Sequence, residues 1–304
     1  MLKINFGYSM SKLVSVIILS YNHVGFIENT IKSVLNQSYK NIEIIVIDDG
    51  STDDSVVFLQ KLRKEIEFKL VCKENGGVVS AINVGIQEAN GDYIVLHACD
   101  DISLPNRFAN QIEMFSRYPE ASFISSNINL VNKEGIYQKE LLKRKKEKVI
   151  NLDDAILGAD ISSVGCIYNA KHLKYIVLDE AYIAEDPQIH LLLLAKFKYA
   201  IVDYDEPVLN YYLNPKGLMN TTFKQLTLQN LQLLKDYKDN KNFKKAYARV
   251  QLTYLSLLSE TSNKQAFNYL YKNINLISER GIHRVMIKIF LPKKTHFLFK
   301  NNRN

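Results

Sequence analysis

Apolar runs of strand length alternate with helix-spaced apolar residues through the first hundred residues. Continuous apolar runs occupy 14–19, 42–47 and 93–99, with a shorter one over 68–72. Between them apolar residues recur at helical spacing, as Ile27 and Ile31 do. Strands that are apolar throughout are typical of a sheet buried on both faces. The alternation with short connections predicts a mostly parallel sheet covered by helices.

The pattern continues more loosely and then changes after about residue 215. We expect helices over 105–119 and 189–197, and strands over 121–126, 161–166, 199–202 and 208–212. From about residue 216 leucine-rich segments at helical spacing replace the alternation. The sequence therefore predicts an α/β domain followed by a helical region.

Polar side chains follow the predicted strands. They are Ser20, Tyr21 and Asn22 after the first strand, Asp48 and Asp49 after the second, and Asp100 and Asp101 after the fourth. Each group alone could be an ordinary turn or helix cap. Because parallel strands end at one sheet edge, all three should meet there, where an aromatic ring, an amide and carboxylates suit a nucleotide. Asp100 and Asp101 would repel each other without a cation, and their oxygens suit Mg²⁺ or Mn²⁺.

Two familiar phosphate-binding motifs are missing. A dinucleotide site needs Gly-x-Gly-x-x-Gly after the first strand, whereas residues 20–25 read Ser-Tyr-Asn-His-Val-Gly. The phosphate loop ending in Gly-Lys-Ser/Thr is also absent from the sequence. A metal held by carboxylates is the remaining obvious way to hold phosphates.

The composition of the chain bears on its cellular location and leaves a second class of function, nucleic-acid binding, open. The 304 residues are 47% hydrophobic, with no apolar run long enough to span a bilayer and no signal-peptide layout at the start. Cys72, Cys99 and Cys166 lie far apart in apolar sequence, so we expect reduced core thiols and a cytoplasmic protein. A net charge of +7 suggests an anionic partner and keeps a nucleic-acid binder open. The acid clusters at the sheet edge argue against nucleic acid.

Four motifs in order resemble family 2 glycosyltransferases with the GT-A fold. They are residues 14–22, residues 36–39 with 44–53, the stretch from Asn75-Gly76-Gly77 to Gly85, and Gly91 to Asp101. The resemblance covers about the first 125 residues closely and weakens to about residue 215. It implies a GT-A catalytic domain over 1–215, with a nucleotide-sugar half (about 12–125) and an acceptor half (about 126–215). Residues 216–304 would form a helical C-terminal region with a basic amphipathic tail.

The resemblance assigns roles to the polar residues at the sheet edge. It implies that Ser20, Tyr21 and Asn22 lie against the nucleoside, with Tyr21 stacking on the base, and that Asp48 binds the base edge with Asp49 nearby. Gly77 would belong to the donor site. Asp100 would hold Mn²⁺ or Mg²⁺ on the diphosphate, and Asp101 would support the metal or touch the sugar.

Two departures from the family pattern keep an alternative open. Ala98 stands where the family often has the first aspartate of Asp-x-Asp-Asp, and Ile82 stands where it often has arginine. A nucleotide-sugar-binding protein that has lost catalysis is therefore the second hypothesis.

The acid pair Glu185-Asp186 precedes an apolar helix. From the residues alone a helix cap is the simpler interpretation. The resemblance implies that Asp186, or Glu185 as second choice, is the catalytic base, which is chemically reasonable because a sugar hydroxyl needs its proton removed to attack.

The last segment, 281–304, interleaves basic and large apolar residues and contains no acid. This composition suits the surface of an anionic membrane, although a packed terminal helix is the alternative. The resemblance implies an inverting, metal-dependent hexosyltransferase that uses a UDP-sugar and a saccharide acceptor, and we expect the acceptor to be lipid-linked if the tail meets the membrane. It would act on the inner face of the plasma membrane in bacterial surface polysaccharide (O-antigen-type lipopolysaccharide) biosynthesis.

Overall fold

The structure, a computed structural model, describes residues 12–132, 134–143, 145–213, 218–279 and 282–290. The chain divides into two compact units. The first comprises residues 1–155 and 159–214, and the second comprises residues 156–158 and 215–304. The two units are described separately below.

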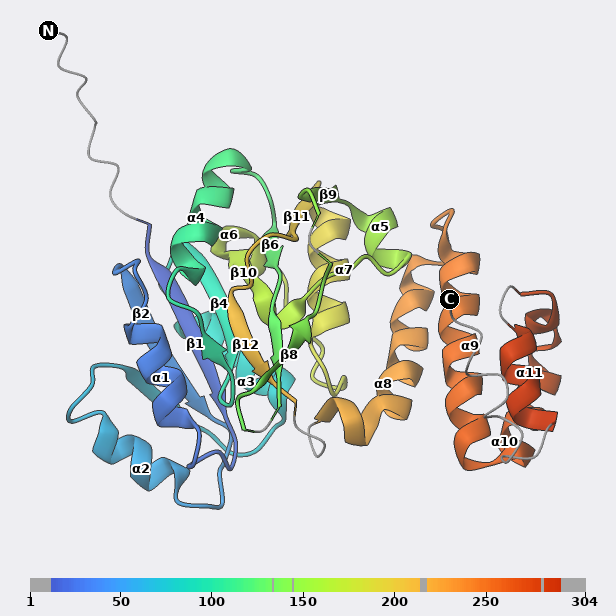
Figure 1. The fold of residues 1–304 in the computed structure, drawn as a ribbon, viewed down its shortest axis with the longest axis horizontal. Helices are drawn as coiled ribbons and strands as arrows, with labels where there is room; N and C mark the ends of the chain where they lie inside the picture. The colour runs from blue at the N-terminus through green and yellow to red at the C-terminus, as the bar shows by residue number, and fades with distance from the viewer. Residues whose placement is uncertain (1–11, 133, 144, 214–217, 280–281, 291–304) are drawn as a thin grey trace, which may run out of the picture. The chain divides into compact units, whose positions relative to one another are not determined.

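Within the described residues, eight strands form the main sheet of the first unit (Figure 1). Their spatial order is β3-β2-β1-β4-β10-β6-β11-β9. Neighbours among β1 to β4 run parallel, as do β6 and β11, whereas β10 and β9 run antiparallel to their neighbours. The strands are β1 (Val14–Ser20), β2 (Ile42–Asp48), β3 (Lys69–Cys72), β4 (Tyr93–Ala98), β6 (Phe123–Ser126), β9 (Lys148–Ile150), β10 (Cys166–Asn169) and β11 (Ala200–Asp203).

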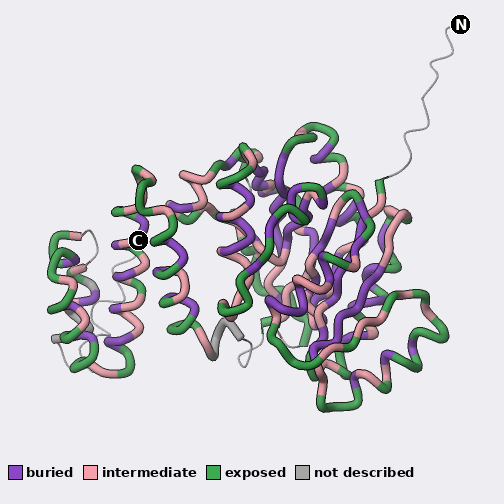
Figure 2. The backbone as a smooth tube through the Cα atoms, turned by 180° about the vertical axis from the view of Figure 1, so that it is seen from behind, coloured by how far each residue is buried: buried purple, intermediate pink, exposed green. Residues whose placement is uncertain are grey.

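Helices cover both faces of this sheet, and successive strand residues face opposite sides. Val16 and Ile18 pack toward one face and Ile17 toward the other. One face is covered by α1 (Ile27–Leu35), α2 (Ser55–Leu62) and α4 (Arg107–Arg117), and the other by α3 (Val78–Glu88), α6 (Ala170–Leu173) and α7 (Asp186–Lys196). Buried residues accordingly concentrate on the strands (Figure 2). The predicted mixed, mostly parallel sheet covered by helices is confirmed.

A second, smaller sheet has the order β5-β12-β7-β8. It contains β5 (Ile102–Ser103), β7 (Asn129–Val131), β8 (Tyr137–Glu140) and β12 (Leu209–Tyr212), and the short helix α5 (Leu152–Ile156) follows β9. β12 pairs antiparallel with β5, Asn210 lying opposite Ile102. This pairing brings Tyr211 and Tyr212 beside Asp101, although they are 110 residues or more apart in sequence.

Three local predictions were wrong. The strand predicted over 161–166 begins only at Cys166, because Gly165 closes a 3-10 turn (η1, Ser163–Gly165) directly against β6. A Cβ on Gly165 would lie 2.3 Å from the Ser126 carbonyl oxygen. Helix α7 begins at Asp186 rather than at residue 189. Cys72 is exposed, unlike the other two cysteines, because β3 is an edge strand.

The second unit is helical and has its own core. Its elements are α8 (Leu218–Leu234), η2 (Lys235–Tyr237), α9 (Phe243–Thr261), α10 (Asn263–Lys272), η3 (Ile274–Ser278) and α11 (Ile282–Phe290). Val285 and Ile289 of α11 are buried against α9 and α10 residues. The first part of the predicted membrane tail is thus a packed helix, and residues 291–304 lie outside the described residues. None of the helices in the described part of the chain has the length and hydropathy needed to cross a membrane.

Candidate active site

The carboxyl ends of β1, β2 and β4 lie in register at one edge of the main sheet. Ser20 at the end of β1 pairs with Asp48 at the end of β2, and Leu19 pairs with Ala98 at the end of β4. The polar residues that follow these strands therefore leave from the same edge, as the sequence predicts. Open α/β sheets bind ligands at this edge.

Asn22 and Asp48 are both tied into the loop that follows β2. Asn22 has a φ of 57°, a left-handed conformation that asparagine tolerates better than most residues. Its Oδ1 accepts hydrogen bonds from the backbone N–H groups of Thr52 (2.8 Å) and Asp53 (3.2 Å). The fully buried carboxylate of Asp48 accepts bonds from the N–H (2.8 Å) and the hydroxyl (2.6 Å) of Ser51. Both side chains thus hold this loop in place.

Tyr21 directly precedes Asn22 and reaches the surface. Its side chain is 44% exposed, whereas the preceding Ser20 is buried. Its neighbour Asn22 also donates its backbone N–H to the Ser51 hydroxyl at 2.9 Å. An exposed ring on a hydrogen-bonded loop is suited to stacking against a planar ligand.

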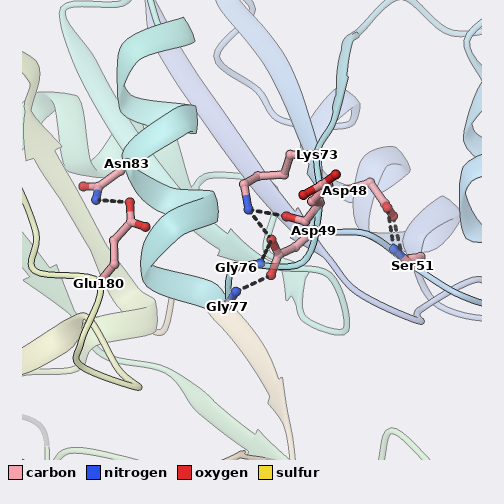
Figure 3. A network of polar contacts seen from close by, with 9 residues as sticks. Asp48, Asp49, Ser51, Lys73, Gly76, Gly77, Asn83 and Glu180 are labelled. Atoms are coloured by element: carbon pink, nitrogen blue, oxygen red, sulfur yellow. Dashed lines mark hydrogen bonds and ion pairs between the residues drawn. The ribbon is translucent and has the colours of Figure 1, made fainter.

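Asp49 holds the glycine turn that opens α3 (Figure 3). Its Oδ1 accepts bonds from the ammonium of Lys73 at 2.7 Å and the N–H of Gly76 at 3.0 Å, and its Oδ2 accepts the N–H of Gly77 at 2.8 Å. Gly77 has φ 86° and ψ 167°, a conformation confined largely to glycine. The buried carboxylate of Asp49 therefore fixes the turn through hydrogen bonds, and Lys73 is its counter-ion.

The helix after this turn is tied to the segment that leads to the acid pair. The side-chain amide of Asn83 donates to the Leu178 carbonyl and to a carboxylate oxygen of Glu180, both at 3.0 Å (Figure 3). The preceding Ile82 is fully buried in the core between α3 and the sheet. The position where the family often has arginine is thus a core position in this chain.

Asp100 and Asp101 differ sharply in their surroundings. Asp101 is almost fully buried, and its Oδ1 accepts the backbone N–H of Tyr212 at 3.2 Å. Burial, followed by the neighbouring charge of Asp100, raises the pKa of Asp101 well above the ordinary aspartate value. Asp100 is half-buried, and within the described residues its carboxylate makes no hydrogen bond or ion pair. Asp100 is therefore the carboxylate that is free to meet a ligand.

A buried arginine interacts electrostatically with Asp101. Arg107 is 1% exposed, and its guanidinium donates to the Ser103 hydroxyl (3.2 Å) and to the carbonyls of Val164 (3.0 Å) and Cys166 (3.3 Å). Burial lowers the pKa of Arg107 to about 10, and the charge of Asp101 opposes this shift. Arg107 thus joins the loop after β4 to the start of β10.

His97 belongs to the same buried network and not to the ligand surface. Its Nε2 lies 2.9 Å from the Ser103 hydroxyl and its Nδ1 lies 2.7 Å from the Ala98 carbonyl oxygen. Burial, and then the charge of Arg107, lowers the pKa of His97 to about 3. His97 is therefore neutral at physiological pH and acts as a core residue.

The second acid pair lies at the start of α7. Glu185 precedes the helix, Asp186 is its first residue, and Pro187 follows at a favoured position. Burial raises the pKa of both carboxyls above their ordinary values. The charge of Asp186 raises the pKa of Glu185 further, whereas a hydrogen bond from the Ser163 hydroxyl opposes the rise for Asp186. Asp186 is thus the member that ionises more readily, which suits a general base.

Tyr211 on β12 connects the two acid pairs electrostatically. Its pKa is raised first by burial and then by the charges of Asp101, Asp100 and Asp186. One phenol therefore lies within range of the carboxylates at the end of β4 and of the carboxylate that starts α7. Among the predicted metal-binding and base residues, Asp100, Asp101 and Asp186 are thus near enough to Tyr211 for their charges to raise its pKa.

The carboxylates of Asp100 and Asp101 suit a cation that takes most of its ligands from water and substrate phosphates. Among the described residues no cluster of three or more His, Cys, Asp or Glu side chains could hold a metal. Ala98, two residues before Asp100, offers no oxygen. Mg²⁺ is commonly held by one or two carboxylates together with water and substrate phosphates, and Asp100 with Asp101 behind it provides that arrangement.

Sequence reasoning missed Lys73, Arg107 and Tyr211. Lys73 directly follows β3 at the ligand edge, so its position was a usable signal. Arg107 is the first residue of the helix that follows Pro105, a position where the sequence pattern predicts an ordinary surface residue. The strand containing Tyr211 was predicted, but its pairing with β5 was not. The contacts of Arg107 and Tyr211 are decided by partners distant in sequence.

Comparison with known proteins gives related sequences for about two fifths of the chain or less. The chain is 37% identical to UDP-Glc:alpha-D-GlcNAc-diphosphoundecaprenol beta-1,3-glucosyltransferase WfaP of Escherichia coli over 119 residues, which is 38% of this chain and 46% of WfaP. The matched region is 20% of the length of an uncharacterised glycosyltransferase of Rickettsia conorii. It is less than half of the length of seven further curated relatives.

Similar solved structures extend the likeness to the fold of nearly the whole chain. TarS 1-349 of S. aureus in complex with UDP has a TM-score of 0.63 at 18% identity, covering 91% of this chain and 88% of that one. Mannosyltransferase PcManGT from Pyrobaculum calidifontis in complex with GDP-Man and Mn²⁺ has a TM-score of 0.61 at 16% identity, covering 95% and 88%. At such identities the likeness shows the GT-A fold alone. Glycosyl transferase family 2 matches residues 15–176, more than half of the chain, and this chain belongs to that family.

Proposed function

We propose that the chain transfers a hexose or N-acetylhexosamine from a UDP-sugar to a saccharide acceptor with inversion at the anomeric carbon. The observation that carries the proposal is that Asp100 lies half-buried at the ligand edge of the sheet with no hydrogen bond or ion pair within the described residues, while Asp186, at the start of α7, lies near enough for the charges of both to raise the pKa of Tyr211. A single displacement needs one group that stabilises the leaving diphosphate and another that takes the acceptor proton. The two pairs supply these functions separately.

The donor nucleotide would bind at the edge formed by β1, β2 and the glycine turn. Tyr21 would stack on the base, and Asp48 with Ser20 and Asn22 would line the nucleoside. The turn at Gly77, fixed by Asp49, would approach the phosphates with its backbone. The UDP bound in the TarS structure supports a uridine nucleotide.

Asp100 would hold Mn²⁺ or Mg²⁺, and Asp101 would support it from its buried position. When bound, such a cation neutralises charge that develops on a leaving diphosphate. Asp101 is already hydrogen-bonded to the Tyr212 N–H, so it would fix the loop that presents Asp100. The Mn²⁺ in the PcManGT structure supports a divalent cation at this kind of site.

Asp186 would accept the proton of the attacking acceptor hydroxyl. Because burial raises its pKa, the carboxylate is a stronger base than an exposed aspartate. Glu185 has its pKa raised further and would keep its proton while Asp186 is ionised. Inversion at the anomeric carbon needs a base that activates the acceptor hydroxyl on one side of the sugar and a leaving diphosphate on the other side.

The acceptor would be a lipid-linked saccharide of bacterial cell-surface polysaccharide synthesis. This proposal rests on the printed activity of WfaP, which acts on a diphosphoundecaprenol-linked sugar. It also rests on the basic charge of residues 215–304, which would favour the inner face of an anionic membrane.

A thermal-shift panel of nucleotides and nucleotide sugars, each with and without Mn²⁺, tests the donor site first. A ligand that binds only the folded state raises Tm, so UDP or one UDP-sugar should raise it in a metal-dependent way. Asp100→Ala should abolish the metal-dependent part, whereas Asp160→Ala, which removes an exposed carboxylate, should leave it intact. A Tm that no nucleotide changes would contradict the proposal.

Sugar transfer then separates the enzyme from the binding-protein alternative that Ala98 suggests. Incubation of the protein with the UDP-sugar found in the panel and a lipid-linked saccharide should release UDP. Asp186→Asn should abolish transfer while the UDP-induced Tm shift persists. Donor binding without transfer to any acceptor tried would favour a nucleotide-sugar-binding protein.

A further inference from the structure

A row of residues crosses the second sheet from Tyr211 to the outer strand β8. Tyr211 of β12 lies opposite Leu130 of β7, and Leu130 lies opposite Lys139 of β8. Neighbouring strands are about 4.8 Å apart, so the backbone of Lys139 lies about 10 Å from that of Tyr211. This separation is comparable to the length of one hexose with a diphosphate attached to it.

Lys139 belongs to the same face of the sheet as Tyr211. Residues directly opposite each other on neighbouring strands share a face. Leu130 and Tyr211 pack against one small apolar cluster together with Val164, which agrees with a shared face. Val164 belongs to η1, the turn that also supplies the hydroxyl bonded to Asp186. The proposed base and Lys139 therefore lie on the same side of the second sheet.

The ammonium group of Lys139 is available to a ligand. The side chain is exposed, and in the described part of the chain it has no hydrogen bond or ion pair. Two later lysines of the same basic stretch do have acid partners, Lys145 with Asp160 at 3.4 Å and Lys148 with Asp154 at 2.7 Å. Lys139 differs from these two because no described carboxylate neutralises it.

A buried asparagine holds the backbone that follows Lys139. Asn127 is fully buried, and its Oδ1 accepts the backbone N–H of Leu142 at 2.9 Å. Its Nδ2 donates to the Glu140 carboxylate at 3.0 Å and to the Leu142 carbonyl at 3.1 Å. Lys139 therefore projects from a strand whose position is fixed, and not from a loose loop.

A negatively charged acceptor would need a cation in this place. Its attacking hydroxyl must approach Asp186, and the carboxylates of Asp100 and Asp101 lie near the same phenol as Asp186. These acids repel an anion, whereas they do not repel a neutral saccharide. An ammonium group on the same face offsets the repulsion, and its hydrogen bonds to phosphate are stronger than those between neutral groups.

We propose that Lys139 binds the diphosphate at the reducing end of the acceptor while a hydroxyl of the acceptor sugar meets Asp186. The inference rests on the proposed function and deepens it, because it names the acceptor as a saccharide that carries a diphosphate. Lys139 contacts the acceptor and takes no part in proton transfer.

Calorimetric binding of two probes to the full chain, saturated with UDP and Mn²⁺, tests this site without requiring turnover. One probe is N-acetylglucosamine α-diphosphate carrying an undecyl chain, whose sugar is the one in the acceptor of WfaP. The other is the uncharged undecyl α-glycoside of the same sugar. The wild type should bind the diphosphate probe about tenfold more tightly than the glycoside, and added salt should reduce the difference.

Variants at Lys139 separate the charge from the rest of the site. Lys139→Met should weaken binding of the diphosphate probe about tenfold and leave binding of the glycoside unchanged, whereas Lys139→Arg should keep most of the affinity. Lys61→Met, which removes an exposed lysine from the last turn of α2, is the matched control and should bind both probes as the wild type does. Tm should be the same in all these proteins, because neither lysine is buried.

Two results would overturn the inference. One is a wild-type protein that binds the diphosphate probe no more tightly than the glycoside. The other is a Lys139→Met variant that binds the diphosphate probe as the wild type does. Failure of the proposed function gives a different result, in which binding of the diphosphate probe depends on Lys139 but no acceptor receives a sugar.

Discussion

Replacing Arg107 with methionine should destabilise the first unit by about 3 kcal/mol. Methionine fills much of the same buried volume but removes the donors to the Val164 and Cys166 carbonyls and to the Ser103 hydroxyl. A buried acceptor left unpaired costs about 1–3 kcal/mol. Loss of the buried cation near Asp101 adds to this, although water entering the space would recover part of it.

The loss should also depend on pH, because Asp101 would be buried without its cation. The pKa of Asp101 is already raised in the folded protein and is held down in part by Arg107, so Arg107→Met should raise it further. A carboxyl whose folded pKa exceeds its unfolded pKa binds more protons when folded. Stability then falls as pH rises through the interval between the two values. The deficit of the variant should therefore be larger at pH 8 than at pH 5.

Denaturant unfolding at both pH values measures this, with Asp101→Asn as the second arm of a double-mutant cycle. Asparagine keeps an oxygen for the Tyr212 N–H but carries no charge, so it should recover part of the loss in the Arg107→Met background at pH 8. Arg63→Met, at an exposed arginine, should change the unfolding free energy by less than about 0.5 kcal/mol. A loss under about 1 kcal/mol for Arg107→Met, or an equal loss at both pH values, would refute the reasoning.

Three further predictions concern the site. Asp186→Asn should lower kcat about a hundredfold or more with little change in UDP affinity. In the wild-type enzyme the rate should fall on the acid side of the pH–rate profile at a pH above the ordinary aspartate pKa, because burial raises the pKa of Asp186. Gly77→Ala should lower the free energy of unfolding, measured with denaturant, by about 2 kcal/mol and weaken UDP binding measured by calorimetry, because the backbone conformation of Gly77 suits glycine although a Cβ would meet no atom within 4 Å. Gly25→Ala is the control, because Gly25 is equally uncrowded and has no positive φ. Equal effects of the two substitutions would count against backbone strain at Gly77. Ile82→Arg should lower stability by at least about 3 kcal/mol, because it buries an unpaired charge, and a stable variant with tighter UDP binding would show that this position faces the nucleotide.

Local patterns were reliable where strands are long and fully buried. Residues 14–20, 42–48 and 93–98 form strands within one residue of the predicted limits, because continuous apolar runs need burial on both faces. Prediction failed at 161–166, where Gly165 packs against β6 at the end of a turn. It also missed β5, β7 and β8 of the second sheet, which have two to four residues each. Such short strands carry too few residues to show a period.

The sequence by itself determined the α/β fold and the sheet edge where the polar residues that follow β1, β2 and β4 gather. Parallel strands place their carboxyl ends together whatever the details of packing. The tertiary structure alone decided how each acid is used. Asp49 pairs with Lys73 and the glycine turn. Asp101 is buried and accepts the Tyr212 N–H, whereas Asp100 has no hydrogen bond or ion pair in the described part of the chain. The surroundings of Asp101 come from partners distant in the chain, whose contacts depend on the packing of whole elements and therefore leave no local signature in the sequence.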